Sequence, residues 1–479
     1  MNFARRIALP ALALWASLAV PFASAAEPTN ALAAYKLQAA PQSDLPARRA
    51  TLDAEFTTSI ETLAKEREKE KDSAAATALR SWIAPLDPAL IAVPQLPDEV
   101  APKPAADSWE AGFVAIRSGY GDKLLALARE AQQGQDYALA RTLLLEAARQ
   151  KPDDEAIRKL LGQSLYRGRW RTTYEREQIE AGLVWDDRWG WLRSTHLPEY
   201  EQGKRFVEVE GRNGRPKGAW VSAEQEAELR RDIEKGWAVE TEHYRVVTNH
   251  SQAEAVRLAK RLEELHHVWR EAFLSFWATP DQLRTMFDKP LKTQATRHEV
   301  ICFRDRAEYV RTLRGQSGGD VSISTGVYFN ATEKAYFYVD DENDDGTLLH
   351  EASHQLFSET NKSIRAAGRR PNFWENRKAN FWIVEGIACF METLRAENGR
   401  WIVGGTDTNR FRYAQYRTVN QGWFEPIANL TGYSMNELVR QPEVASLYSE
   451  SAALVVYLMR EPRRRVAMDA YLVDVYLGQ

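Results

Sequence analysis

The chain has 479 residues, of which 44% are hydrophobic and 27% are charged, and its formal net charge is −4. This length can build two or three domains, and the small, evenly mixed charge excludes the concentrated basic face of a nucleic-acid-binding protein. Only two cysteines, Cys302 and Cys389, are present, which excludes a disulfide scaffold and a four-cysteine zinc site. The two could form one bridge or remain core thiols.

Residues 1–26 have the pattern of a secretory signal peptide. Two arginines precede an apolar run over 7–22, and Ala-Ser-Ala at 23–25 provides a small-residue cleavage site. Pro10 and Pro21 interrupt the apolar run, which favours a signal peptide over a transmembrane helix. We therefore expect a periplasmic or secreted protein whose mature chain has no membrane span.

Residues 27–107 predict a charged helical segment followed by a proline-rich linker. Acidic and basic residues alternate over 65–71, as is typical of a solvent-exposed helix face. Six prolines between Pro85 and Pro104 exclude a helix or a central strand. This part should therefore run as an extended, wrapping segment.

Residues 108–170 have a helical pattern, with a hairpin over 123–133 and 137–150 and a third helix over 154–166. Leu161 follows Leu127 by 34 residues, the period of the tetratricopeptide repeat (TPR), which the region resembles. The alternative is a plain helical hairpin. Because about one and a half repeats are too few to be stable alone, this all-α region should pack on a neighbour.

Residues 171–239 are rich in tryptophan, and we interpret them as an irregular connector that covers the next domain. From residue 240 onward, strand and helix patterns alternate before helices dominate. The expected strands are 243–248, 300–303, 326–329 and 335–339, and the expected helices between them are 251–277 and 304–314. This order predicts an α+β domain over 240–479, with a small mixed sheet and a helical half.

A helix predicted over 347–357 carries His350, Glu351 and His354. Acidic residues at 340–345 suit the positive end of its dipole. Residues four apart lie on one helix face, so both imidazoles could bind one metal ion while Glu351 holds a water molecule against it. The alternative interpretation of this His-Glu-x-x-His motif is a structural pair of histidines.

A catalytic zinc ion needs a third protein ligand and keeps one position for water. A second helix pattern over 380–392 places Glu385 in the midst of an apolar run. Because an unpaired buried carboxylate is costly, Glu385 is the candidate third ligand beside His350 and His354, for one Zn²⁺ per chain. Glu392 could hydrogen-bond a ligating histidine or lie exposed on the helix.

The pattern Trp-x-x-Glu-Gly-x-Ala at 382–388 resembles the third-ligand helix of gluzincin metallopeptidases of the aminopeptidase branch. The segment 447–458 is similar to the helix that carries their transition-state tyrosine, so the resemblance implies that Tyr448 donates a hydrogen bond to the oxyanion. Without the resemblance, Tyr448 is expected to pack in the core. Three other tyrosines are alternatives for this role: Tyr413, Tyr416 and Tyr433.

Residues 121–479 together resemble an exported bacterial family that combines a TPR-like region with a peptidase MA-like (gluzincin) domain. Two features depart from true aminopeptidases: the metal helices are more widely spaced, and no Gly-x-Met-Glu-Asn segment precedes them to hold a substrate amine. The resemblance therefore implies a zinc endopeptidase. In this mechanism zinc activates water and polarises the carbonyl, Glu351 transfers the proton, and Tyr448 stabilises the oxyanion.

Several features bear on substrates and on other functions. A free strand edge at 326–329 or 335–339 could bind an extended peptide, and the arginine-containing segment 362–378 could favour acidic substrates or simply be solvated. The alternatives to a peptidase are a non-enzymatic envelope scaffold, whose TPR-like helices bind a protein partner, and a zinc amidase acting on cell-wall peptide. His266, His267 and the other remaining histidines have no partner at ligand spacing and are interpreted as structural.

Overall fold

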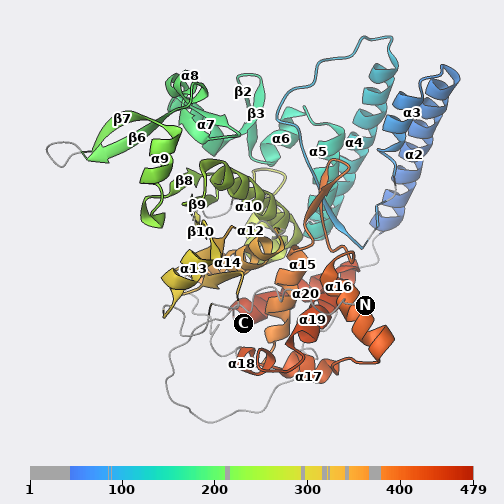
Figure 1. Cartoon of the computed structure of the whole chain (residues 1–479). Coiled ribbons are helices and arrows are strands. Elements are labelled where there is room, and N and C mark those ends of the chain that lie inside the picture. Colours follow the sequence, from blue (N-terminus) through green and yellow to red (C-terminus); the bar gives the residue numbers. More distant parts are fainter. Residues whose placement is uncertain are drawn as a thin grey trace.

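The computed structural model describes residues 44–84, 86–87, 89–210, 216–292, 297–315, 321, 324–339, 345–365 and 379–477. The predicted signal peptide, the acidic run at 340–344 and most of the arginine-containing segment lie outside the described residues. Within them the chain is α+β, as the sequence predicts (Figure 1). No helix in this part of the chain has both the length and the apolar character required to cross a membrane.

Four helices pack together in the N-terminal part: α2 (Leu45–Lys69), α3 (Ser73–Arg80), α4 (Trp109–Gln133) and α5 (Tyr137–Gln150). The predicted hairpin is present and α5 has the predicted bounds, but α4 begins at Trp109, well before the predicted start at residue 123. Small residues of the hairpin such as Ala128 and Ala140 are fully buried. The third helix is shorter than predicted. It is α6 (Glu155–Leu160), and it ends before Gly162, whose φ of 82° is left-handed. The predicted helix over 154–166 is therefore wrong beyond residue 160, where strand β2 follows.

The N-terminal helices are joined to the rest of the chain by a continuous hydrophobic core. Buried ion pairs cross the same boundary. Arg141 of α5 donates two hydrogen bonds of 2.7 Å to Glu271, and Arg400 contacts Glu146 of α5 at 3.0 Å. The expectation that this region packs on a neighbour is confirmed.

The tryptophan-rich segment is regular, so its prediction as an irregular connector is wrong. Three β-hairpins, each followed by a helix, run from residue 163 to residue 229, and the first of them begins within the region predicted as all-α. The first unit is β2 (Gln163–Tyr166), β3 (Arg169–Thr172) and α7 (Thr173–Glu180); the second is β4 (Leu183–Asp186), β5 (Gly190–Arg193), η1 (Ser194–His196) and α8 (Leu197–Glu201); the third is β6 (Lys204–Glu210), β7 (Pro216–Ser222) and α9 (Ala223–Leu229). The short helix η2 (Ile233–Lys235) follows. Each unit begins at a glycine with positive φ: Gly162, Gly182 and Gly203.

A five-stranded mixed sheet supports the C-terminal half. Its strands are β8 (Trp237–Glu240), β9 (Tyr244–Thr248), β10 (His298–Phe303), β11 (Gly326–Phe329) and β12 (Lys334–Tyr338). Their order is β11-β12-β10-β9-β8, with the three central strands parallel and the outer pairs antiparallel. Among the described strands β11 lies at an edge, as one alternative predicted, whereas residues 335–338 belong to an internal strand and offer no free edge.

Helices cover both faces of this sheet. Successive side chains of β10 point to opposite faces of the sheet. Cys302 packs in the main core, which also contains residues of α10 (Gln252–Ala272) and α14 (Gly346–Arg365). Phe303 packs on the other face, in a smaller cluster with α13 (Arg306–Leu313). The short helices α11 (Leu274–Trp277) and α12 (Pro280–Arg284) follow α10.

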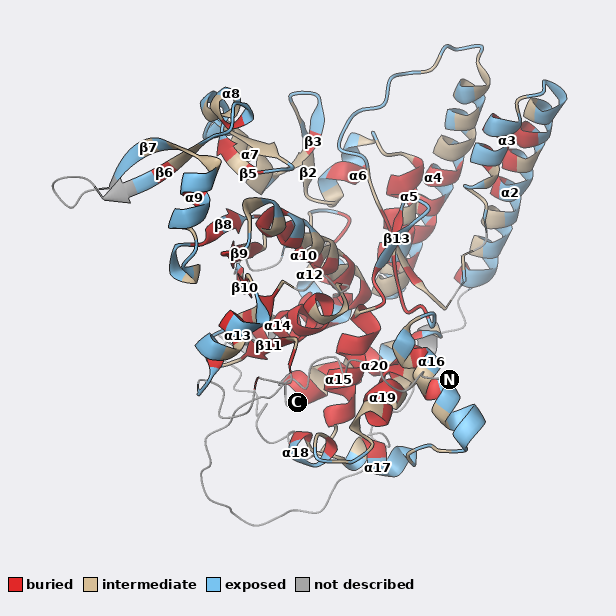
Figure 2. Ribbon diagram, viewed as in Figure 1, coloured by how far each residue is buried: buried red, intermediate tan, exposed pale blue. Residues whose placement is uncertain are grey.

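The remaining helices form the predicted helical half, in which α15 is buried along its whole length (Figure 2). They are α15 (Phe381–Met391), α16 (Asn409–Gln415), the π-helix η5 (Tyr416–Asn420), α17 (Ile427–Gly432), α18 (Met435–Leu438), α19 (Val444–Met459) and α20 (Pro462–Leu477). A second sheet has the strand order β1 (Ile91–Pro94), β14 (Arg400–Val403), β13 (Arg395–Glu397). The proline-rich segment thus adds an edge strand, consistent with the predicted wrapping role.

Candidate metal centre

Helices α14 and α15 bring the three predicted metal ligands together. The ligand atoms of His350, His354 and Glu385 all lie within 4.8 Å of one another. His350 Nε2 is 3.1 Å from both His354 Nε2 and Glu385 Oε2, and His354 Nε2 is 3.7 Å from the same carboxylate oxygen. All three side chains are almost completely buried. The arrangement therefore directs two imidazole nitrogens and a carboxylate oxygen toward one point.

Close packing of α15 against α19 fixes one side of this site. A Cβ atom on Gly386 would lie 2.7 Å from the Ser451 carbonyl oxygen and 2.7 Å from Val455 Cγ2. Only glycine permits this approach between the two helices. It brings Tyr448, on α19, into the electrostatic field of the Glu385 carboxylate.

A hydrogen-bonded chain holds the imidazole ring of His350. Its Nδ1 lies 2.6 Å from Glu392 Oε1, and Arg410 donates to both oxygens of Glu392 at 2.6 Å. With its Nδ1 proton directed to Glu392, His350 keeps the Nε2 lone pair for a metal ion. Of the two alternatives for Glu392, the structure shows the hydrogen bond to a candidate ligand histidine and not an exposed position on the helix. Arg410 was missed, because its distance of 18 residues from Glu392 carries no periodic signal.

The carboxylates around His350 are ionised. Burial alone would raise the pKa of Glu385, but His354 and His350 lower it to about 2. Burial likewise opposes ionisation of Glu392, but Arg410 and His350 lower its pKa to about 2. Burial also opposes protonation of His350, but its contacts with Cys389, Glu385 and Glu392 raise its pKa well above the ordinary value. A bound metal cation would take the place of the second ring proton of His350 and leave Nε2 as its ligand.

Glu351, the predicted base, points one oxygen at the edge strand of the sheet. Its Oε2 accepts a hydrogen bond of 3.1 Å from the backbone N–H of Tyr328 on β11. Its Oε1 is buried and has no hydrogen-bond partner among the described residues. Burial raises the pKa of Glu351, which makes it a stronger base than an exposed carboxylate.

Tyr448 differs from the three alternative tyrosines. It is 4% exposed, and its hydroxyl has no hydrogen-bond partner in the described part of the chain. Burial and the Glu385 carboxylate raise its pKa well above 10, so it keeps its proton. By contrast, Tyr433 donates to Glu425 at 3.0 Å and Tyr416 is 50% exposed. Tyr413 is half-buried.

The side chains present fit a zinc ion. Two imidazole nitrogens and one carboxylate oxygen are the ligand set of many catalytic zinc sites. The second carboxylate oxygen of Glu385 is buried and has no hydrogen-bond partner within the described ranges. An unsatisfied buried anionic oxygen is costly, and a bound cation would remove that cost.

The structure also bears on the two cysteines and on His266. Cys302 and Cys389 are both buried free thiols, so of the two alternatives the structure shows core thiols. The interpretation of His266 as lacking a partner at ligand spacing is wrong, because it lies with His243 and Glu263 in another group of side chains that could hold a metal ion.

Comparisons of this chain with protein-family models, with curated proteins and with solved structures find no match. Any function must therefore be inferred from the side chains and their geometry.

Proposed function

We propose that the chain is an exported zinc-dependent peptidase that hydrolyses internal peptide bonds. The observation that carries the proposal is the convergence of His350, His354 and Glu385 beside Glu351, whose Oε1 is buried and has no partner among the described residues. A structural zinc site would have no use for such a base, which argues against a non-enzymatic scaffold. The resemblance to gluzincin peptidases points the same way.

Zinc in this site would supply a Lewis acid that polarises a carbonyl group and favours ionisation of water. The side chains supply the rest of the chemistry. His350, His354 and Glu385 would hold the ion, with His350 oriented by Glu392. The Glu351 carboxylate would accept a proton from the attacking water and pass it to the leaving amine.

Tyr448 would stabilise the transition state. Because its raised pKa keeps the hydroxyl protonated, it can donate a hydrogen bond to the oxyanion that forms on the substrate carbonyl. Among the described residues its hydroxyl has no hydrogen-bond acceptor, which is consistent with a donor whose acceptor is the bound substrate.

Strand β11 offers the means to align a substrate. It is the edge strand on the side of the base, since the Tyr328 N–H donates to Glu351. An extended peptide that adds to this edge would pass close to the Glu351 carboxylate. The substrate class that fits is therefore an unstructured peptide or protein segment.

The test is the variant Glu351→Gln in the mature protein. Metal content by elemental analysis should stay at about one zinc ion at this site, whereas hydrolysis of an unstructured protein should fall by about 10²–10⁴-fold. A cell-wall peptide fragment in the same assay distinguishes a peptidase from an amidase. Unchanged hydrolysis in Glu351→Gln would refute the proposed base.

A matched control is Glu359→Gln. Glu359 is a buried carboxylate on the same helix. It accepts a hydrogen bond from His298 and belongs to none of the candidate ligand groups of the described residues. This variant should retain hydrolysis, so a loss confined to Glu351→Gln cannot be attributed to removing any buried carboxylate from α14.

A further inference from the structure

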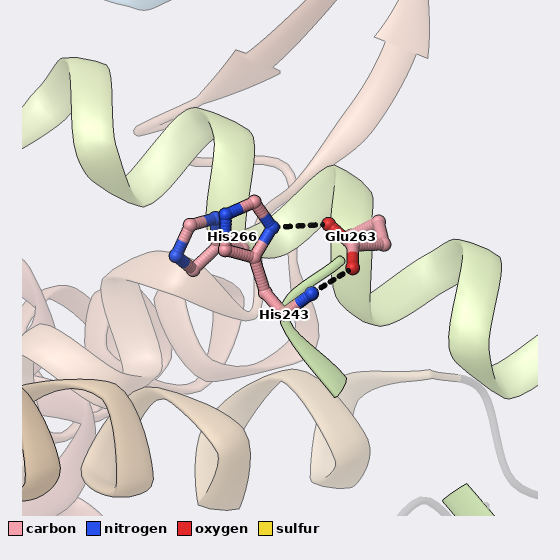
Figure 3. Close-up of side chains that lie close together, drawn as sticks. All are labelled: His243, Glu263 and His266. Atoms are coloured by element: carbon pink, nitrogen blue, oxygen red, sulfur yellow. Dashed lines mark hydrogen bonds and ion pairs between the residues drawn. The ribbon is translucent and has the colours of Figure 1, made fainter. Parts of the chain in front are cut away.

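A second group of metal-binding side chains lies between β9 and α10. His243 directly precedes β9, and Glu263 and His266 belong to α10. Their ligand atoms lie within 4.8 Å of one another. Figure 3 shows the two imidazole rings against each other beside the Glu263 carboxylate; the ring centroids are 3.7 Å apart and the planes are inclined by 23°.

The backbone holds these donors in place. Glu263 and His266 are three residues apart on α10 and so lie on one helix face, a Glu-x-x-His spacing that helical metal sites use. Glu263 accepts hydrogen bonds of 2.8 Å from the backbone N–H and from Nδ1 of His243. These two bonds fix the carboxylate and the first imidazole relative to each other.

The hydrogen bond between His243 and Glu263 does not include the third side chain of the group, His266. It is 4% exposed, and no hydrogen bond to its ring is found among the described residues. The nearby His298 does not bind it either, because the ring centroids are 6.3 Å apart and His298 is paired with Glu359. Its ring is therefore not committed to another side chain in this part of the chain, and one of its nitrogens lies within 4.8 Å of the ligand atoms of His243 and Glu263.

We propose that His243, Glu263 and His266 form a second site, for a divalent transition-metal ion of the zinc class. Two imidazole nitrogens and a carboxylate oxygen suit such an ion. The side chains of His243 and Glu263 are 14% and 27% exposed, so an ion can enter from solvent and complete its coordination with water. The ion would join the start of β9 to α10, and the inference does not depend on the peptidase activity.

The experiment measures zinc bound by the full mature chain after equilibrium dialysis and elemental analysis. We expect about two ions per wild-type chain and about one in each of the variants Glu263→Gln and His266→Ala. His267→Ala is the matched control. Among the described residues, this neighbouring ring of α10 belongs to no group that could hold a metal ion, and it packs on Trp401. Its variant should therefore keep both ions.

The outcomes separate this site from the His350 site. Glu385→Ala should lose one ion and keep the one held by His243, Glu263 and His266. If the wild type binds one ion and Glu263→Gln retains it, the second site does not exist. Binding of Co²⁺ gives a second measurement that does not depend on counting zinc. The Glu263→Gln variant, shown to be folded by circular dichroism, should lose about half of the visible Co²⁺ absorption of the wild type. An unchanged spectrum would overturn the proposal.

Discussion

Replacing Gly386 by alanine should separate the two helices that carry Glu385 and Tyr448. The added Cβ atom would lie 2.7 Å from the carbonyl oxygen of Ser451. This oxygen is backbone and cannot rotate away. Because ordinary contacts of a Cβ are 3.4–4 Å, α15 and α19 must move apart by at least about 0.7 Å.

The expected magnitude follows from two opposing terms. Overpacking of this kind costs about 1–3 kcal/mol, whereas alanine gains up to about 1 kcal/mol over glycine in a helix interior. The net loss of unfolding free energy should therefore lie between 0 and about 2 kcal/mol. A displacement approaching 1 Å between Tyr448 and the metal ligands should also lower kcat by about 10–100-fold.

The assay combines thermal unfolding, zinc content and kcat of Gly386→Ala. Gly119→Ala is the control, because Gly119 lies within α4 and an added Cβ there would meet no atom within 4 Å. That variant should gain about 0.5–1 kcal/mol and keep full activity. If Gly386→Ala proves as stable and as active as the wild type, the inference that helix contact positions Tyr448 is wrong.

Three further perturbations address the oxyanion donor, the helical boundary and a buried acid. Tyr448→Phe should lower kcat by about 10²-fold without changing zinc content, and a loss below about tenfold would assign the hydrogen bond to another group. Arg141→Leu should cost about 3–5 kcal/mol in urea unfolding because it leaves the buried Glu271 carboxylate unpaired, and adding Glu271→Leu should restore much of the loss. Burial raises the pKa of Asp469 to about 7, against about 3.9 when unfolded. Its contribution to stability is therefore fully present below pH 4 and lost as the pH rises through 7. At pH 8, Asp469→Asn should have a higher free energy of unfolding in urea than the wild type, by up to about 4 kcal/mol. Equal unfolding free energies at that pH would contradict the raised pKa.

The candidate ligands could be predicted because helical geometry places them locally. His350 and His354 share a face wherever a helix forms, and an acid in an apolar helix such as Glu385 needs a partner. The group around His266 could not be predicted in the same way. His243 lies 20 residues before Glu263 along the chain, and only the packing of a strand end against a helix brings them into contact.

The fold was predictable where elements are long and periodic. The helices α4, α5 and α14 satisfy this condition, but the strands of the first two hairpin units have only four residues, too few for alternation to be visible. The sequence does contain a signal for these units. Glycine recurs at 162, 182 and 203, and each second strand carries a tryptophan two residues before its last residue.

The group of His350, His354 and Glu385 differs from the group of His243, Glu263 and His266 in whether a separate carboxylate lies beside the candidate ligands. The group of His350 has a separate carboxylate beside it, Glu351. Its Oε1 has no hydrogen-bond partner among the described residues and burial raises its pKa, so under the proposed function proton transfer falls to a residue that is not a ligand. In the group of His243, the carboxylate is Glu263 itself, and both of its oxygens already accept hydrogen bonds. Among the described residues this second group has no carboxylate left to act as a base. An ion bound there would hold β9 against α10, and hydrolysis would remain confined to the site between α14 and α15.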